Sequence, residues 1–224
     1  PLAHAALNAP KSSSRRQALK LLLLLGAGSA LTWGLREQLP VNPLLADFST
    51  PVGQRRNLQL HDGSQLQLNT ASAVDVKFDA QQRVIRLLEG EMLLTAARDS
   101  RPLLVRTAQG TVQPQAARLN VRQFGDRTEI AVFEGRVALM PTAHTGSALW
   151  GEPHQQLSFT RLAWNTPRPL DAGSGAWTDG MLVAAHMRLA DFLVELGRYR
   201  RGQLNCDPTA ADLLISGTAP LDAS

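Results

Sequence analysis

The chain has 224 residues, of which 44% are hydrophobic and 19% charged, a composition typical of folded proteins and incompatible with disorder throughout. Its net charge of +4 is confined to the N-terminus, because the first 20 residues carry four basic and no acidic side chains. A neutral body with 5% aromatic residues lacks the basic surface and stacking platforms of nucleic-acid-binding proteins, so we expect no nucleic-acid partner. The single cysteine excludes an internal disulfide framework and a structural zinc site built on cysteines.

The basic N-terminus leads into an uncharged, leucine-rich segment, residues 21–35. With Lys20 snorkelling to the headgroups, this segment is long enough to cross a slightly thinned bilayer as a helix. Four basic residues precede this segment, whereas the charges of Arg36 and Glu37 cancel each other after it. The positive-inside rule therefore places the N-terminus in the cytoplasm. We therefore predict a single-pass membrane protein whose residues after about 36 are exported.

Two alternatives to a retained anchor stay open. A basic segment followed by a short apolar run also describes a cleaved signal peptide. The pair Arg15 and Arg16 resembles a twin-arginine export signal, although two adjacent arginines equally satisfy the positive-inside rule.

After Pro51 the apolar residues alternate with polar ones. Leu58 and Leu60 precede a turn at residues 61–63, and Leu66 and Leu68 follow it, which predicts a hairpin. Further alternating runs occupy residues 74–78, 84–88, 92–94, 103–105, 119–121, 130–132, 137–139 and 157–164. Predicted turns lie at residues 89–91, 125–126 and 134–135. Short strands at this spacing predict an antiparallel all-β sandwich, jelly roll or solenoid-like domain.

The C-terminal region has a different pattern. Apolar residues fall on one stripe of an amphipathic helix that is predicted to end at Gly202, and they are Leu189, Phe192, Leu193, Leu196 and Tyr199. Strand-like runs at residues 181–183, 204–206 and 213–215 surround this helix. The tail is therefore predicted as a β-α-β-β unit whose one helix leaves a sheet face uncovered.

The predicted organisation is a basic juxtamembrane segment over residues 1–20, a transmembrane helix over 21–35, a tether over 36–50, an all-β domain over 51–164, a linker over 165–176 and an α+β tail over 177–224.

No catalytic constellation is evident in the sequence. The five histidines are scattered and form no metal-binding pair with an acid, so we expect no metal, no cofactor and no enzymatic activity. Glu89 and Glu91 flank a glycine in a predicted hairpin turn, where carboxylates are normally solvated.

Two features of the tail have alternative interpretations. Cys206 shares a predicted strand face with Leu204, where it packs as a small hydrophobic residue or forms an intermolecular disulfide. Arg198, Arg200 and Arg201 lie at the end of the predicted helix, where they complement the helix dipole or form a docking patch for a partner.

The order of these features resembles the FecR-type family of transmembrane sensors, anti-sigma regulators of bacterial iron-siderophore uptake. Residues 60–70 carry the signature Leu-x-Asp-Gly-Ser-x-Leu-x-Leu-Asn-Thr, and residues 83–91, 101–107, 134–137, 177–180 and 199–202 continue the match. The signature positions are Asp62, Gly63, Ser64, Leu68, Asn69, Gly90, Glu91, Gly135 and Trp177. One departure is Ala116-Ala117, which stands where the family usually has Gly-Thr.

The resemblance implies a single-pass inner-membrane regulator with a periplasmic FecR domain. Its tail looks like the first half of the small domain shared by secretins and TonB-dependent receptors. Such a protein relays a signal from the signalling domain of an outer-membrane siderophore receptor to a cytoplasmic extracytoplasmic-function (ECF) sigma factor. The sigma factor would bind an N-terminal domain that this sequence does not contain.

We expect the receptor to contact the tail by strand-edge pairing or at the end of the helix. The candidate residues are Leu213, Leu214, Ile215, Arg198, Tyr199, Arg200 and Arg201. The alternative function is a membrane-tethered structural or glycan-binding β module of the envelope, for which aromatic residues on the strand surface would be diagnostic.

Overall fold

The computed structural model describes residues 45–221. The predicted juxtamembrane segment and transmembrane helix, and most of the tether, lie outside this range. Within it, no helix is long and apolar enough to cross a membrane. The described residues are mainly β-structure, which confirms the fold class predicted from the alternating pattern.

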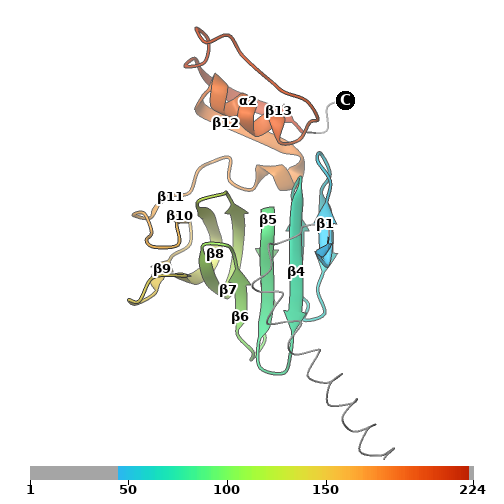
Figure 1. Ribbon diagram of the computed structural model, residues 1–224, viewed down its shortest axis with the longest axis vertical. Coiled ribbons are helices and arrows are strands. Elements are labelled where there is room, and N and C mark those ends of the chain that lie inside the picture. Colours follow the sequence, from blue (N-terminus) through green and yellow to red (C-terminus); the bar gives the residue numbers. More distant parts are fainter. Residues whose placement is uncertain (1–44, 222–224) are drawn as a thin grey trace, which may run out of the picture. The chain divides into compact units, whose positions relative to one another are not determined.

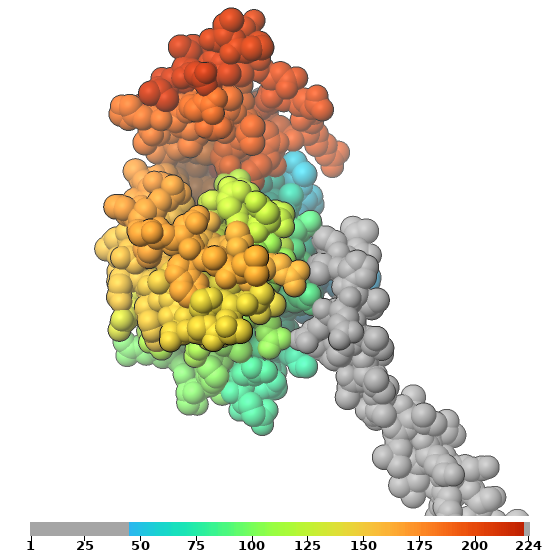
Figure 2. All heavy atoms as spheres, turned by 60° about the vertical axis from the view of Figure 1, so that its left-hand side comes forward, coloured from blue at the N-terminus to red at the C-terminus, as the bar shows by residue number. Residues whose placement is uncertain are grey.

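Eleven strands form one sheet (Figure 1). Their bounds are β1 Phe48–Thr50, β2 Arg56–Gln59, β3 Gln65–Leu68, β4 Ser72–Phe78, β5 Arg83–Thr95, β6 Leu103–Arg106, β7 Gly110–Gln123, β8 Thr128–Pro141, β9 Leu149–Gly151, β10 Gln155–Phe159 and β11 Arg168–Pro169. β1 lies in the predicted tether and β11 in the predicted linker, so both segments contribute to the sheet. In Figure 2, the yellow and orange chain from β9 onward covers part of one face of this domain.

The long strands change neighbours halfway along their length. The first half of β5 pairs with β4 and, in parallel, with β6, whereas its second half pairs with β3 and β7. β8 likewise pairs with β10 through its first half and with β9 through its second half. The sheet is therefore continuous in hydrogen bonding but folded over, and the parallel pairing of β5 with β6 departs from the purely antiparallel arrangement that was predicted.

A register shift, or bulge, accompanies each fold-over: in β5 it lies between Leu87 and Glu89, and in the β7–β8 pair it lies on both sides of Glu134. Gly90 in β5 and Gly135 in β8 have φ of +83° and +70°, a conformation that L side chains rarely adopt. A Cβ at Gly90 would lie 2.6 Å from the carbonyl oxygen of Ala71, and one at Gly135 would lie 2.7 Å from the Cα of Ala117. The turns predicted at both glycines are thus wrong, because the strand bends there and continues.

The bulge keeps the apolar side chains inside on both halves of β5. Ile85 and Leu87 precede it, Met92 and Leu94 follow it, and all four are buried in one core. Since the bulge shifts the alternation by one residue, Glu91 and Leu93 point to the opposite, outer face of the second half. That outer face is where the tail packs.

The tail contains one short 3-10 helix, two strands and one α-helix. They are η2 Ala176–Asp179, β12 Met181–Arg188, α2 Leu189–Gly197 and β13 Leu214–Pro220. β12 and β13 pair antiparallel, and α2 lies along this pair (Figure 1). None of the nine residues of α2 is buried.

The predicted β-α-β-β order of the tail is corrected to β-α-β. Residues 204–206 form no strand, and the chain after them turns at Asp207, whose carboxylate accepts hydrogen bonds from Thr209. The helix ends at Gly197 instead of Gly202, since the chain then turns to bury Tyr199 against the sheet.

Ala116-Ala117 stands where the FecR-type family usually has Gly-Thr, and Ala116 has a strained backbone conformation. Its φ is +46°, a left-handed conformation that costs a residue with a Cβ about 1 to 2 kcal/mol. We predict that Ala116→Gly raises the free energy of unfolding by about 1 kcal/mol after the greater flexibility of the unfolded chain is deducted. Urea denaturation measures this, with Ala80→Gly as the control, because Ala80 is also exposed but has no positive φ. Equal effects of the two substitutions would contradict the assignment of strain.

Candidate functional site

The tail contacts the outer face of the sheet through a small apolar cluster. Leu93 of β5 packs with Trp177, Tyr199 and Leu221 of the tail, and all four are buried. Partly buried Phe133, Leu182 and Leu196 complete the cluster. These contacts define the junction between the sheet and the tail.

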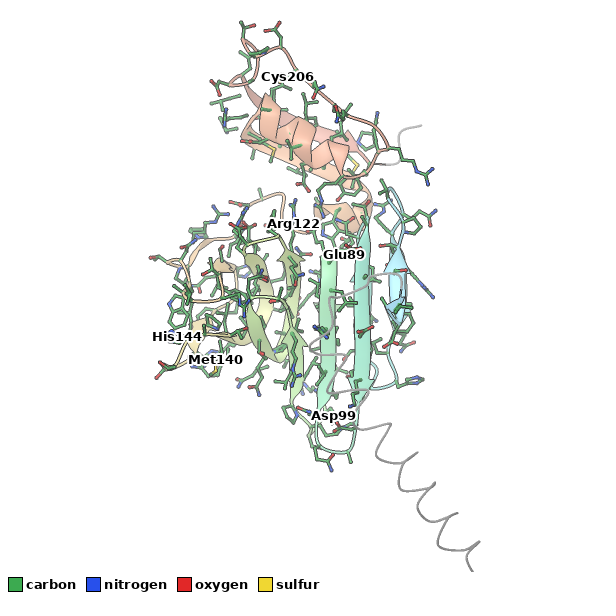
Figure 3. The ribbon with its side chains drawn as sticks, viewed as in Figure 1. Glu89, Asp99, Arg122, Met140, His144 and Cys206 are labelled. Atoms are coloured by element: carbon green, nitrogen blue, oxygen red, sulfur yellow. The ribbon has the colours of Figure 1, made fainter. Side chains whose placement is uncertain are left out.

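Glu91 lies at the centre of the polar part of this junction. Its carboxylate accepts hydrogen bonds from the side-chain amides of Asn69 and Asn120, each at 2.9 Å. The guanidinium of Arg198, from the tail, lies 2.9 Å from the same carboxylate. A buried carboxylate thus receives three donors from both sides of the junction. The solvated hairpin turn predicted for Glu91 is wrong, whereas Glu89 is exposed (Figure 3).

The surroundings of Glu91 favour its charged form. Burial by itself would raise the pKa of this carboxyl group, but the positive charges of Arg198 and Arg122 and the two asparagine hydrogen bonds outweigh it. The pKa of Glu91 therefore lies below the usual glutamate value of 4.5. The carboxylate is ionised at neutral pH and pairs with a cation that is itself largely buried.

A second ion pair supports the first from the edge of the junction. Arg122 of β7 lies 2.8 Å from Glu195 of α2, and Glu195 also pairs with Arg198. Figure 3 shows Arg122 at the end of the sheet. The charges Arg122, Glu195, Arg198 and Glu91 therefore alternate in sign across the junction.

Tyr199 and Trp177 place their polar atoms in the same network. Asn69 donates a hydrogen bond to the Tyr199 hydroxyl at 2.7 Å, and the indole nitrogen of Trp177 donates to the Asn120 side-chain oxygen at 3.1 Å. Burial, together with the negative charge of Glu91, raises the pKa of Tyr199 to about 12. Within residues 45–221, every buried side-chain polar atom has a hydrogen-bond partner.

Backbone contacts also hold the chain after α2. The Thr70 hydroxyl donates to the carbonyl oxygen of Arg198 at 2.9 Å and accepts a hydrogen bond from the backbone N–H of Gly53 at 2.8 Å. Arg55 donates to the carbonyl oxygen of Trp177 at 2.8 Å. The Asn-Thr of the signature thus acts at the junction, where Asn69 and Thr70 each bind the tail.

The first part of the signature stabilises the sheet itself. Asp62 pairs with Arg83 at 2.6 Å, and their side chains are 0% and 5% exposed. Asp62 also accepts hydrogen bonds from the backbone and hydroxyl of Ser64. Although burial raises the pKa of Asp62, the Ser64 hydrogen bonds and the charge of Arg83 bring it below the usual value of 3.8.

The residues predicted to bind a partner divide into two groups. Leu213 and Leu214 are 59% and 64% exposed, and Ile215 beside them is half-buried. Arg200 and Arg201 are exposed at the end of α2. Tyr199 and Arg198, in contrast, face the sheet, so a partner does not reach them while the tail is docked.

The remaining signature positions have structural roles. Leu68 is in the core, Gly63 forms the hairpin turn with φ of +84°, and Trp177 anchors the start of the tail. The burial of Glu91 was missed, although apolar residues on both sides of residues 89–91 were a signal that the strand continues.

A cleft and a free cysteine also lie in or beside the tail. A cleft of about 540 Å³ lies between the sheet and the tail, lined by Glu91, Arg122 and Phe124 on one side and by Met187 and Val194 on the other. Cys206 lies in the loop after α2 (Figure 3), half-buried and free, so its predicted position on a strand is wrong. No cluster of potential metal ligands occurs among the residues that the structure describes.

Comparisons with known proteins show a family match for part of the chain and a shared fold for most of it. Residues 46–138 match the FecR family, described as FecR protein, which confirms the resemblance seen in the sequence. The fold is similar to two crystal structures of a candidate anti-sigma factor from Parabacteroides distasonis. The first has 23% identity and a TM-score of 0.66 over 79% of this chain and 85% of that chain, and the second has 22% identity and a TM-score of 0.65 over 79% and 84%. No curated protein sequence matches this chain.

We predict that Asp62→Asn lowers the free energy of unfolding by about 3 kcal/mol at neutral pH, because it leaves the buried Arg83 guanidinium unpaired. The depressed pKa of Asp62 stabilises the fold above pH 3.8, and this stabilisation is lost as the pH falls through the lower pKa of the folded state. The difference between wild type and variant should therefore shrink in acid.

Urea denaturation over a pH series measures both effects. Asp99→Asn is the matched control, because Asp99 (labelled in Figure 3) pairs with Arg101 in a loop, and both side chains are partly exposed. A difference that does not change with pH, or an equal loss in the control, would contradict the buried pair.

Proposed function

Because residues 46–138 are a FecR domain, we propose that the chain is a signalling regulator of the anti-sigma type. It acts by binding other proteins, and its described part receives the contact of a partner. The fold shared with the candidate anti-sigma factor from Parabacteroides distasonis supports this proposal, since the likeness includes most of the described residues.

The open edge of β13 is the observation that carries the proposal. Among the described residues, β13 pairs with β12 alone, so its other edge is without a neighbouring strand. Leu213 and Leu214 lie at the start of this edge and are more than half exposed. An open strand edge with exposed apolar residues is a template for an added strand.

The proposed partner is the signalling domain of an outer-membrane TonB-dependent siderophore receptor. One strand of that domain would pair with β13, and the exposed Arg200 and Arg201 near the end of α2 would meet acidic groups on it. Binding transmits information only if the two receptor states differ in affinity for the tail, and such couplings are typically about 1 to 3 kcal/mol.

The proposed output is an ECF sigma factor in the cytoplasm. Residues 21–35 would cross the inner membrane, and a domain N-terminal to this sequence would bind the sigma factor. Support comes from the FecR domain and from the distribution of charge around the apolar segment.

The structure gives little support to the alternative function, a glycan-binding module. Among the exposed large hydrophobic residues of the described range, Trp150 is the one aromatic, and the guanidinium of Arg136 lies 5.2 Å from its ring centre. A sugar-binding platform needs an open aromatic face, and this one carries a cation.

We predict that Leu214→Asp weakens binding of the receptor's signalling domain at least about tenfold, because a charge at the strand edge opposes strand addition. Titration calorimetry with isolated signalling domains of TonB-dependent receptors from the same cells measures the affinity, and far-UV circular dichroism monitors the sheet. Val194→Asp is the control, since Val194 is 71% exposed on α2, away from the strand edge. Loss of binding in Val194→Asp but not in Leu214→Asp would assign the docking to the helix face and contradict strand addition.

A further inference from the structure

The tail is fixed to the sheet at two places. At its start and end, Trp177 and Leu221 are buried together, and the Leu221 backbone N–H donates to the carbonyl oxygen of Gly180 at 2.8 Å. At the end of α2, Arg198 and Tyr199 bind Glu91, Asn69 and Thr70, as described above. We call the first place the hinge and the second the latch.

Between the hinge and the latch, contact with the sheet is incomplete. The cleft of about 540 Å³ separates Val183 and Met187 of β12 and Val194 of α2 from Phe124 and Ile130 of the sheet. Residues 181–220 therefore contact the sheet through the cluster around Leu93 and the ion pairs of Glu195 and Arg198, and not along the cleft.

These residues also bury little apolar surface of their own. α2 has no buried residue, and Ala184 is the only buried residue of β12 and β13. Two strands and one helix cannot form a core that holds them by itself, so the position of residues 181–220 depends on the hinge and the latch.

The ion pair of the latch opens without a large loss of free energy. Its charges are taken out of water when it closes, and both return to water when it opens, so the net stabilisation from a buried ion pair is small. The apolar contact between Tyr199 and Leu93 is the part of the latch that resists opening, because it gains nothing from exposure to water.

From these observations we infer that residues 181–220 form a lid that opens and closes on the outer face of the sheet, with Gly180 and Leu221 as its hinge and the Glu91–Arg198 pair as its latch. The open state exposes Glu91, Leu93 and Asn120 of the sheet while the folded core stays intact. This inference goes beyond the proposed function, because it requires no receptor and holds whichever partner binds β13.

Tyr199 provides a specific probe of the latch, because it is the only tyrosine of the chain and is 7% exposed when the lid is closed. Nitration of its ring by tetranitromethane requires access from solvent, so the rate of nitration measures the population of the open lid. The experiment uses the full chain with Cys206→Ser, which removes the competing thiol. Far-UV circular dichroism follows the sheet in the same samples.

We predict that Tyr199 in the wild-type latch is nitrated at a rate that hardly changes with urea below the unfolding transition of the sheet, as expected for local opening. Arg198→Gln should raise this rate at least about tenfold and leave the β-sheet signal in place. The matched control is Arg201→Gln, which removes an exposed cation three residues away and should leave the rate unchanged.

Three outcomes would overturn the lid. In the first, nitration follows only the unfolding of the sheet, with the same steep urea dependence. In the second, Arg198→Gln abolishes the β-sheet signal, which would make the tail part of one cooperative unit with the sheet. In the third, Arg201→Gln accelerates nitration as much as Arg198→Gln, which would assign the effect to general charge at the helix end.

Discussion

The described structure depends on one buried carboxylate. Glu91 is taken out of water by the tail, and it is tolerated there because two asparagine amides and the guanidinium of Arg198 meet it. Its partners are the residue after β3, a residue of β7 and the residue after α2, so the position of the tail on the sheet and the ionisation of Glu91 determine each other. An apolar residue at this position would remove one of the two carboxylates that pair with Arg198 at the junction.

The bulge of β5, between Leu87 and Glu89, creates the surface that this interaction needs. A strand without a bulge would keep Glu91 on the same side as Ile85 and Leu87, where a charge would enter the core. The bulge reverses the alternation, so that the second half of β5 directs Met92 and Leu94 inward and Glu91 and Leu93 outward. The bulge in β5 thus folds the sheet over its core and directs the side chains of Glu91 and Leu93 toward the tail.

These constraints separate two surfaces with different uses. The latch side of the tail faces the sheet and is satisfied internally, whereas the β13 edge with Leu213 and Leu214 faces solvent. The proposed function needs such a division, because the surface that receives a partner must differ from the one that holds the tail in place. The lid that we infer would couple the two, since both belong to the same small β-α-β unit.

The sequence by itself determined the mainly β fold class, the hairpin at Asp62-Gly63, the amphipathic helix before Tyr199 and the FecR resemblance, because period and turn chemistry are local properties. It did not determine that residues 89–91 and 134–135 are bends within strands, since a glycine between alternating runs is equally typical of a turn and of a bulge. Only the tertiary structure decided that Glu91 is buried and that Arg198 faces inward. A residue's burial depends on what packs over it, and here that is a helix end more than 100 residues later in the chain.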